Sequence, residues 1–307
     1  HAQAANYMSA LGASGEVVSL RDELTGEIYT VQPKLVVNAA GPWIDQVNKS
    51  LKRDTTFVSG SKGSHIVIDN KNLRSVIGDH EFFFENDDGR IVLICPIVDK
   101  ILVGTSELEC DDPNQVCCTA EEVDYFIAMI MKMFPQANVS RDQIVFSFSG
   151  VRPLIFSQSS DRGNVSRDHR VLLLTPGDGV DYPIYTLAGG KWTTFRSLAE
   201  KVTDQTLHVL GRTRQHSTCN LSIGGGKDYP KNIEEEKLFL DSIILKTGFD
   251  SNRAKELFDR YGSRAAYVAS FICREIGDND SCLDNHSGYS HGEIVFLTRC
   301  EYIMHLA

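Results

Sequence analysis

The sequence predicts a mixed α/β protein: a domain with parallel strands, an antiparallel sheet inserted into that domain, and a helical domain at the end. Residues 34–43 are a continuous apolar run that ends in small residues, which is typical of a strand buried in a parallel sheet. Short apolar runs joined by turn residues lie between 59 and 150, and they indicate antiparallel hairpins. From residue 232 onward, apolar residues recur with helical spacing.

The composition is that of an ordinary globular protein, with 42% hydrophobic and 23% charged residues among 307. A net charge of −10 argues against a nucleic-acid partner, which usually meets a basic face. The eight cysteines form no C-x-x-C pair, so we expect idle thiols in a reducing compartment and no metal site. The chain starts at His1 without a signal peptide and stops within a helical pattern, so we expect a fragment of a longer protein.

The first part, residues 1–58, begins with a hairpin. Residues 16–20 and 27–31 are strand-like runs on either side of a polar turn. After the strand at 34–43, Pro42 suits the first turn of a helix. The apolar face of that helix comes from Ile44, Val47 and Leu51. The strand ends in small residues that allow either a cofactor or tight helix packing to come close: Ala39, Ala40 and Gly41.

The second part, residues 59–150, predicts an antiparallel sheet covered by one helix. A glycine- and serine-rich segment at 59–64 indicates a domain boundary. The expected strands are 64–69, 82–85, 90–96, 100–105 and 144–153. A capping box at 119–122 opens the helix, and Pro135 stops it. Its stripe of Met and Phe side chains predicts core packing rather than a cofactor site.

The third part, residues 151–210, returns to the style of the first. Strands at 171–174 and 182–187 lead to Gly189 and Gly190, and a helix follows from 191. A helix start after a glycine pair suits an anion, because free amide groups and the positive end of the helix dipole point there. Lys191 adds a positive charge. On spacing alone a plain strand-to-helix turn is the favoured alternative.

The last part, residues 211–307, predicts a linker and a small helical domain. The polar segment 211–228, with three consecutive glycines, is interpreted as the linker. The expected helices are 233–246, 251–261, 263–276 and 293–307.

Five segments occur together and in order: 38–43 (NAAGPW), 62–65 (KGSH), 149–154 (SGVRPL), 164–167 (NVSR) and 188–196 (AGGKWTTFR). Together they resemble the FAD-dependent glycerol-3-phosphate dehydrogenases. The resemblance implies an FAD-binding domain formed by 1–58 and 151–210, split by a substrate domain at 59–150 and followed by a truncated helical domain at 211–307.

The resemblance also implies the reaction: oxidation of glycerol 3-phosphate to dihydroxyacetone phosphate by hydride transfer to FAD, with electrons passed to quinone. His65 and Arg152 take the catalytic positions, with His65 as base or alcohol-orienting group. The substrate-binding positions are Arg152, Arg167 and Lys191. The cofactor-binding positions are Ala40, Gly41, Gly189, Gly190, Lys191, Trp192, Thr193 and Thr194. Without the resemblance, His65 reads as a packing histidine and the two arginines as surface residues.

The chain departs from the family pattern at two points. It lacks the strand, G-x-G-x-x-G and helix that hold the FAD pyrophosphate, and Phe195 stands where the family commonly has tyrosine. We therefore expect these 307 residues alone to bind no FAD stably and to be inactive.

Three alternatives remain: another FAD-dependent amine or hydroxy-acid oxidase, an oxygen-using glycerol-3-phosphate oxidase, and an inactive remnant. For the complete protein, the resemblance leaves room for a homodimer and for peripheral contact with a membrane. That membrane is the cytoplasmic side of the inner membrane in a bacterium, or the mitochondrial inner membrane in a eukaryote.

Overall fold

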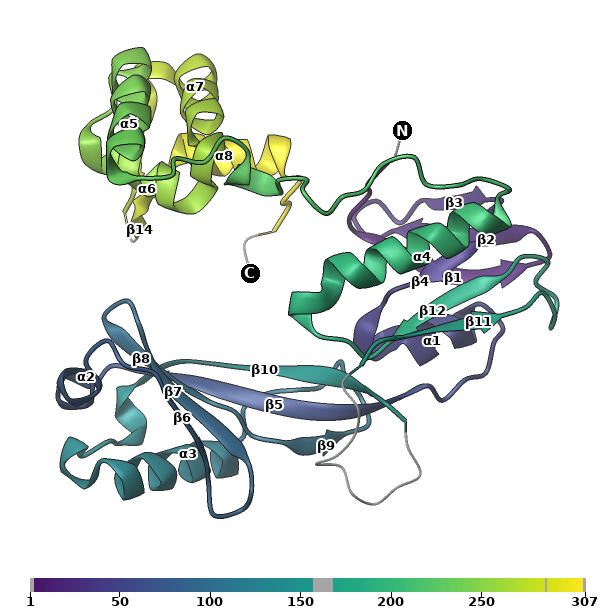
Figure 1. Ribbon diagram of the computed structural model, residues 1–307, viewed down its shortest axis with the longest axis horizontal. Helices are drawn as coiled ribbons and strands as arrows, with labels where there is room; N and C mark the ends of the chain where they lie inside the picture. The colour runs from purple at the N-terminus through teal and green to yellow at the C-terminus, as the bar shows by residue number, and fades with distance from the viewer. Residues whose placement is uncertain (1–2, 157–167, 285, 306–307) are drawn as a thin grey trace. The chain divides into compact units, whose positions relative to one another are not determined.

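The computed structural model describes residues 3–156, 168–284 and 286–305. The chain forms two compact units (Figure 1). The larger comprises Tyr7–Arg214, and the smaller comprises Gln215–Ala307 together with His1–Asn6. Each unit has hydrophobic clusters of its own. Among the described residues, no helix is both long and apolar enough to cross a membrane.

The larger unit contains a six-stranded sheet in the order β10-β5-β8-β7-β6, with β9 also paired to β5. Its strands are β5 (Val58–Ile68), β6 (Phe82–Glu85), β7 (Ile91–Ile97), β8 (Lys100–Gly104), β9 (Leu108–Cys110) and β10 (Ile144–Ile155). Every pair is antiparallel, which confirms the prediction from the hairpin turns. Two helices complete this part, α2 (Lys71–Ile77) and α3 (Ala120–Met133).

One face of this sheet carries the core, and α2 and α3 cover it. Alternate residues of three strands pack there with α3: Ile66 and Ile68 of β5, Val92 and Ile94 of β7, Ile101 and Val103 of β8, and Phe126 and Ile130 of α3. The predicted capping box of α3 is present, with Thr119 and Glu122 bonding reciprocally. Because side chains alternate along a strand, the residues between these core positions point to the opposite face, which we call the site face.

The glycine- and serine-rich segment 59–64 lies inside β5, the strand with which the antiparallel sheet begins at Val58. It pairs with β10 from Ser59↔Leu154 to Ser64↔Ser149. The glycines reflect close packing: a Cβ at Gly60 would lie 2.2 Å from the Cys110 carbonyl oxygen. Hydrogen bonding to neighbouring strands therefore overrides the weak strand propensity of glycine and serine here.

A second sheet of the larger unit has the order β11-β12-β4, with β12 parallel to β4 and antiparallel to β11. Its strands are β4 (Val36–Asn38), β11 (Arg170–Leu174) and β12 (Ile184–Ala188), followed by α4 (Phe195–Val209). The parallel pairing of the 34–43 run is confirmed. Its burial on both faces is not, since Val37 is 40% exposed.

A three-stranded antiparallel sheet precedes it, formed by β1 (Met8–Ser14), β2 (Val17–Asp22) and β3 (Ile28–Val31). The predicted hairpin of β2 and β3 is confirmed, while β1 was not predicted. Helix α1 (Ile44–Ser50) follows Pro42, and Ile44 and Leu51 are buried as predicted.

The smaller unit is helical: α5 (Ile233–Thr247), α6 (Ser251–Tyr261), α7 (Ala265–Glu275) and α8 (His291–Cys300). A short pair of strands was not predicted, β13 (Cys282–Leu283) and β14 (His286–Ser290). The interpretation of 224–226 as linker is wrong. Ser263 Oγ donates a 2.9 Å hydrogen bond to the Gly225 carbonyl, and a Cβ at Gly225 would lie 1.9 Å from the carbonyl oxygen of Tyr261. The glycine triplet therefore packs against the α6–α7 joint.

Candidate functional site

A cavity of about 510 Å³ lies on the site face and contains two of the residues singled out in the sequence, His65 and Arg152. Its lining comes from five strands and the segments between them: His65, Phe83, Asp88, Gly89, Arg90, Ile91, Leu93, Gly104, Thr105, Ser106, Glu107, Arg152 and Leu154. Strand pairing brings His65 and Arg152 together although they are far apart in sequence.

His65 sits in a row of residues that face one another across five strands. The row runs Phe83, Leu93, Gly104, His65, Phe148. The His65 ring stacks on the Phe148 ring, with centroids 4.8 Å apart and planes 4° from parallel. On its other side, a Cβ at Gly104 would lie 2.1 Å from His65 Cδ2, so only glycine leaves room for the ring. The imidazole is thus clamped between an aromatic ring and bare backbone.

This environment favours the neutral imidazole. Burial, and then the positive charge of Arg152, lower the pKa of His65 below its ordinary value of 6.5. His65 Nδ1 is buried without a hydrogen-bond partner in the described part of the chain. A neutral imidazole at neutral pH can accept a proton, which an imidazolium cannot.

Arg152 is held at the cavity by the loop after β8. Its Nη2 donates a 2.9 Å hydrogen bond to Thr105 Oγ1. A Cβ at Gly63 would lie 2.5 Å from Nη2 and 2.6 Å from Nη1, so this glycine makes the space that the guanidinium occupies. Gly63 pairs with Gly150 in the strand register. The planar fork of an arginine suits an oxyanion such as a phosphate.

The predicted cofactor residues lie at the edge of the other sheet. Thr186 of β12 pairs in parallel with Asn38 of β4, so both strands end at the same edge. Each strand then turns through positive φ, at Gly41 (59°) on one side and at Gly189 (71°) and Gly190 (100°) on the other. The structure therefore brings Ala40 and Gly41 to the same edge as Gly189 and Gly190. In open α/β sheets ligands bind at such strand ends.

Residues 4–215 match the family described as FAD dependent oxidoreductase, which is more than two thirds of the chain. The chain belongs to the FAD-dependent oxidoreductases. Residues 216–307 match the C-terminal domain of alpha-glycerophosphate oxidase. Both matches confirm the resemblance seen in the five sequence motifs, and FAD is the cofactor of the family.

Two proteins similar to this oxidoreductase carry related names. Aerobic glycerol-3-phosphate dehydrogenase of Staphylococcus aureus strain MRSA252 is 31% identical over 258 residues, which are 80% of this chain and 44% of that protein. The glycerol-3-phosphate dehydrogenase of Bacillus halodurans, solved in complex with FAD, superposes with a TM-score of 0.71 at 27% identity. The match covers 88% of this chain and 52% of that one. This chain therefore spans about half the length of both relatives.

The edge at which β4 and β12 end, which we call the strand-end edge, offers exposed backbone to a flat ring with an electronegative side. Asn38 fixes the end of β4 against α1, because its side chain donates to the Ile44 carbonyl (2.9 Å) and to Asn48 Oδ1 (2.7 Å). Gly190 is exposed, and bare peptide there lets a ligand approach the backbone. Gly189 has a packing reason as well, since a Cβ would lie 2.6 Å from the Asp168 carbonyl oxygen.

The residues after the glycine pair lie at the start of the following helix. A 3₁₀ turn spans Trp192–Thr194 and continues directly into α4. Lys191 and Thr193 are exposed, Thr194 is half-buried, and Trp192 is 92% exposed. Lys191 is not among the residues that line the His65–Arg152 cavity, so the described residues do not bring these three side chains to one cavity. Arg167, predicted to bind substrate, lies outside the described residues.

A buried polar network under the site was not recognised as such from the sequence. Glu122 of α3 accepts hydrogen bonds from Lys62 Nζ (2.8 Å), Ser64 Oγ (2.8 Å) and Ser106 Oγ (2.6 Å). Burial raises the pKa of Glu122, but these bonds and that from the Thr119 amide outweigh it and lower the pKa to about 2. The ionised Glu122 therefore stabilises the folded state at pH values above 4.5, its ordinary pKa, and this stabilisation is lost as the pH falls towards 2. The sequence showed Glu122 only as a capping residue.

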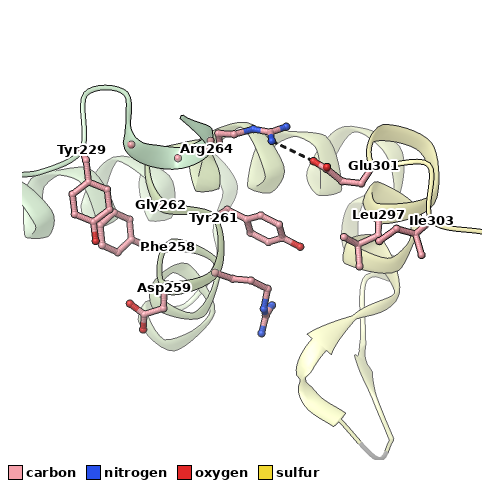
Figure 2. A pocket seen from close by; sticks show the side chains of 13 residues that line it. Tyr229, Phe258, Asp259, Tyr261, Gly262, Arg264, Leu297, Glu301 and Ile303 are labelled. Atoms are coloured by element: carbon pink, nitrogen blue, oxygen red, sulfur yellow. Dashed lines mark ion pairs between the residues drawn. The ribbon is translucent and has the colours of Figure 1, made fainter. Parts of the chain in front are cut away.

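A second cavity, of about 590 Å³, belongs to the helical unit and lies beside the glycine triplet and α6 (Figure 2). Its arginines already have acidic partners. Arg264 lies 3.3 Å from Glu301 (Figure 2), and Arg260 pairs with the buried Glu293. Tyr229 stacks on Phe258 at its rim. These contacts stabilise the fold of the helical unit, so the cavity on the site face remains the candidate site.

Proposed function

We propose that the complete protein carrying this sequence oxidises glycerol 3-phosphate to dihydroxyacetone phosphate with FAD as the hydride acceptor. The observation that carries the proposal is the pairing, in one cavity, of a His65 of lowered pKa with the guanidinium of Arg152. A base for a hydroxyl proton and a fork for a phosphate are the two groups that this substrate requires. The names of the S. aureus and B. halodurans relatives support the choice of substrate.

FAD, when bound, supplies the acceptor for a hydride from the carbinol carbon. The residues that would hold its ring are those of the strand-end edge: Ala40, Gly41, Gly189, Gly190, Lys191, Trp192, Thr193 and Thr194. Lys191 and the start of the helix at Trp192 place positive charge at this edge. We propose that the FAD pyrophosphate is bound by residues of the complete protein outside the part that this chain spans.

In the proposed mechanism, His65 accepts the hydroxyl proton as the C–H bond breaks. Its clamp between Phe148 and Gly104 fixes the ring plane and so the direction from which the hydroxyl approaches. Arg152 binds the phosphate or orients the alcohol, and Thr105 holds its guanidinium in place. Arg167 is proposed as a further cation for the phosphate, whereas Lys191, which does not line this cavity, is kept for the flavin edge.

We extend the proposal to a quinone acceptor, to peripheral contact with the inner membrane and to a homodimer. The support is the resemblance to the glycerol-3-phosphate dehydrogenases. The electron acceptor is identified by measuring the rate at which the reduced enzyme is reoxidised by each candidate. A quinone analogue should reoxidise it faster than dissolved oxygen does. Faster reoxidation by oxygen would favour the oxidase alternative.

The test of the reaction is a substrate screen with the complete, FAD-loaded protein. Anaerobic addition of glycerol 3-phosphate should bleach the flavin absorbance, and dihydroxyacetone phosphate should form in equal amount. Glycerol, amino acids and 2-hydroxy acids without a phosphate should bleach it poorly, because nothing then binds the arginine. Bleaching by an amino or hydroxy acid instead would select the other oxidase class.

Gly63→Ala should weaken the reaction without unfolding the sheet. The added methyl group meets the guanidinium of Arg152, the movable end of a flexible side chain, and pushes it from the cavity. We expect kcat/KM for glycerol 3-phosphate to fall about 10- to 100-fold, since small displacements of binding groups have effects of this size. The matched control is Gly150→Ala on the paired strand, where an added Cβ meets nothing within 4 Å. Equal kcat/KM values for the two variants would contradict the account of Arg152.

A further inference from the structure

The two faces of β5 have different chemistry over four consecutive residues. Lys62 and Ser64 point to the helix face, where both contact the carboxylate of Glu122. Gly63 and His65 point to the site face and its cavity. Each site position on β5 therefore has, next to it in the chain, a residue bonded to Glu122.

The same carboxylate reaches the other wall of the cavity. Ser106 Oγ donates to Glu122 Oε1 at 2.6 Å and accepts from the Ser64 amide at 2.8 Å. Ser106 directly follows Thr105, whose hydroxyl holds Arg152. Glu122 thus ties together the chain segments that carry His65 and the Thr105–Arg152 pair.

We propose that Glu122 is a positioning residue for the candidate site: its buried carboxylate sets the spacing of His65 and Arg152 through Ser64 and Ser106. The inference rests on the proposed function for its kinetic consequence only. Glu122 is 4% exposed and Lys62 7%, so no water competes freely for these bonds. Rigid support of this kind is what catalytic geometry demands of neighbouring residues.

A network that served the fold alone would behave differently from a positioning network when the buried charges are removed together. A buried ion pair can be replaced by neutral residues of similar volume with little loss of stability, whereas removal of one partner is strongly destabilising. Glu122→Gln also keeps the helix cap, because glutamine serves in a capping box as glutamate does. The double variant Lys62→Met/Glu122→Gln therefore separates stability from positioning.

The experiment compares Glu122→Gln, the double variant and Ser106→Ala in the complete protein. We expect kcat to fall about 10- to 100-fold in Glu122→Gln and to stay low in the double variant although its melting temperature recovers. Ser106→Ala should lower kcat, and Ser106→Thr, which keeps the hydroxyl, should restore most of it. Recovery of kcat together with stability in the double variant would overturn the proposal.

A second readout needs no turnover. Titration of His65 by NMR should show its pKa rising towards 6.5 in Glu122→Gln, because a displaced strand exposes the clamped ring. The control is Glu293→Gln, a fully buried glutamate paired with Arg253 and Arg260 in the other unit, which should leave the pKa of His65 unchanged. If the wild-type protein is inactive and Glu122→Gln still raises the pKa of His65, the proposed function is refuted and the positioning role of Glu122 stands. An unchanged His65 pKa in Glu122→Gln would refute the positioning role.

Discussion

Replacing His65 with alanine in the complete protein should lower kcat for glycerol 3-phosphate by about 10²- to 10⁴-fold, the range for loss of a general acid–base group. The FAD content should stay the same, because His65 lies in the cavity of the antiparallel sheet and not at the strand-end edge. Stopped-flow measurement of flavin bleaching gives the rate of the hydride step directly.

The pH profile distinguishes a base from a packing residue. The wild-type kcat/KM should fall as pH drops through the pKa of His65, which lies below 6.5 because of burial and the charge of Arg152. This acidic limb should disappear in His65→Ala. Phe148→Leu is the matched control: it removes the stacked ring and keeps the base, so the limb should shift but persist. An unchanged kcat in His65→Ala would remove the assignment of the base.

Replacing Arg152 with alanine should lower kcat/KM by about 10- to 150-fold, which corresponds to a charge-assisted hydrogen bond of roughly 1.5–3 kcal/mol. Arg152→Lys should restore only part of the loss, because a lysine cannot present two parallel N–H groups to an oxyanion. Arg152→Ala should also move the acidic limb to higher pH, since the positive charge that lowers the pKa of His65 is gone.

Arg141→Ala is the control for the loss of an arginine from the same sheet region. Arg141 is exposed and pairs with Asp124 on α3, away from the cavity lining. It should leave both kcat/KM and the pH profile unchanged, because exposed ion pairs contribute little. A similar loss in Arg141→Ala and Arg152→Ala would mean that total charge, and not the position of Arg152, determines the rate.

The sequence by itself determined the elements that depend on local patterns. The capping box at Thr119 predicted the start of α3, and the polar turns predicted the hairpins of the antiparallel sheet. These features are set within a few residues by backbone hydrogen bonds and turn geometry. The five motifs also indicated the family, which the matches over residues 4–215 and 216–307 confirm.

Local patterns misled where long-range contacts override them. The glycines and serines at 59–64 have weak strand propensity but form the first part of β5, because neighbouring strands on both sides bond to that segment. The glycine triplet at 224–226 read as a linker and packs against Tyr261 and Ser263. In both cases the absence of a side chain serves close packing, which a single sequence does not distinguish from flexibility.

Only the tertiary structure decided how the candidate site is built. Strand register places Gly104 opposite His65, and an empty position there is what admits the imidazole ring. Thr105, Phe148 and Glu122 became relevant for the same reason, since each contacts a residue far away in the chain. The sequence determined which chemical groups are present, because motifs are local. The structure decided which of them meet, because pairing and packing between distant segments set every contact in the site.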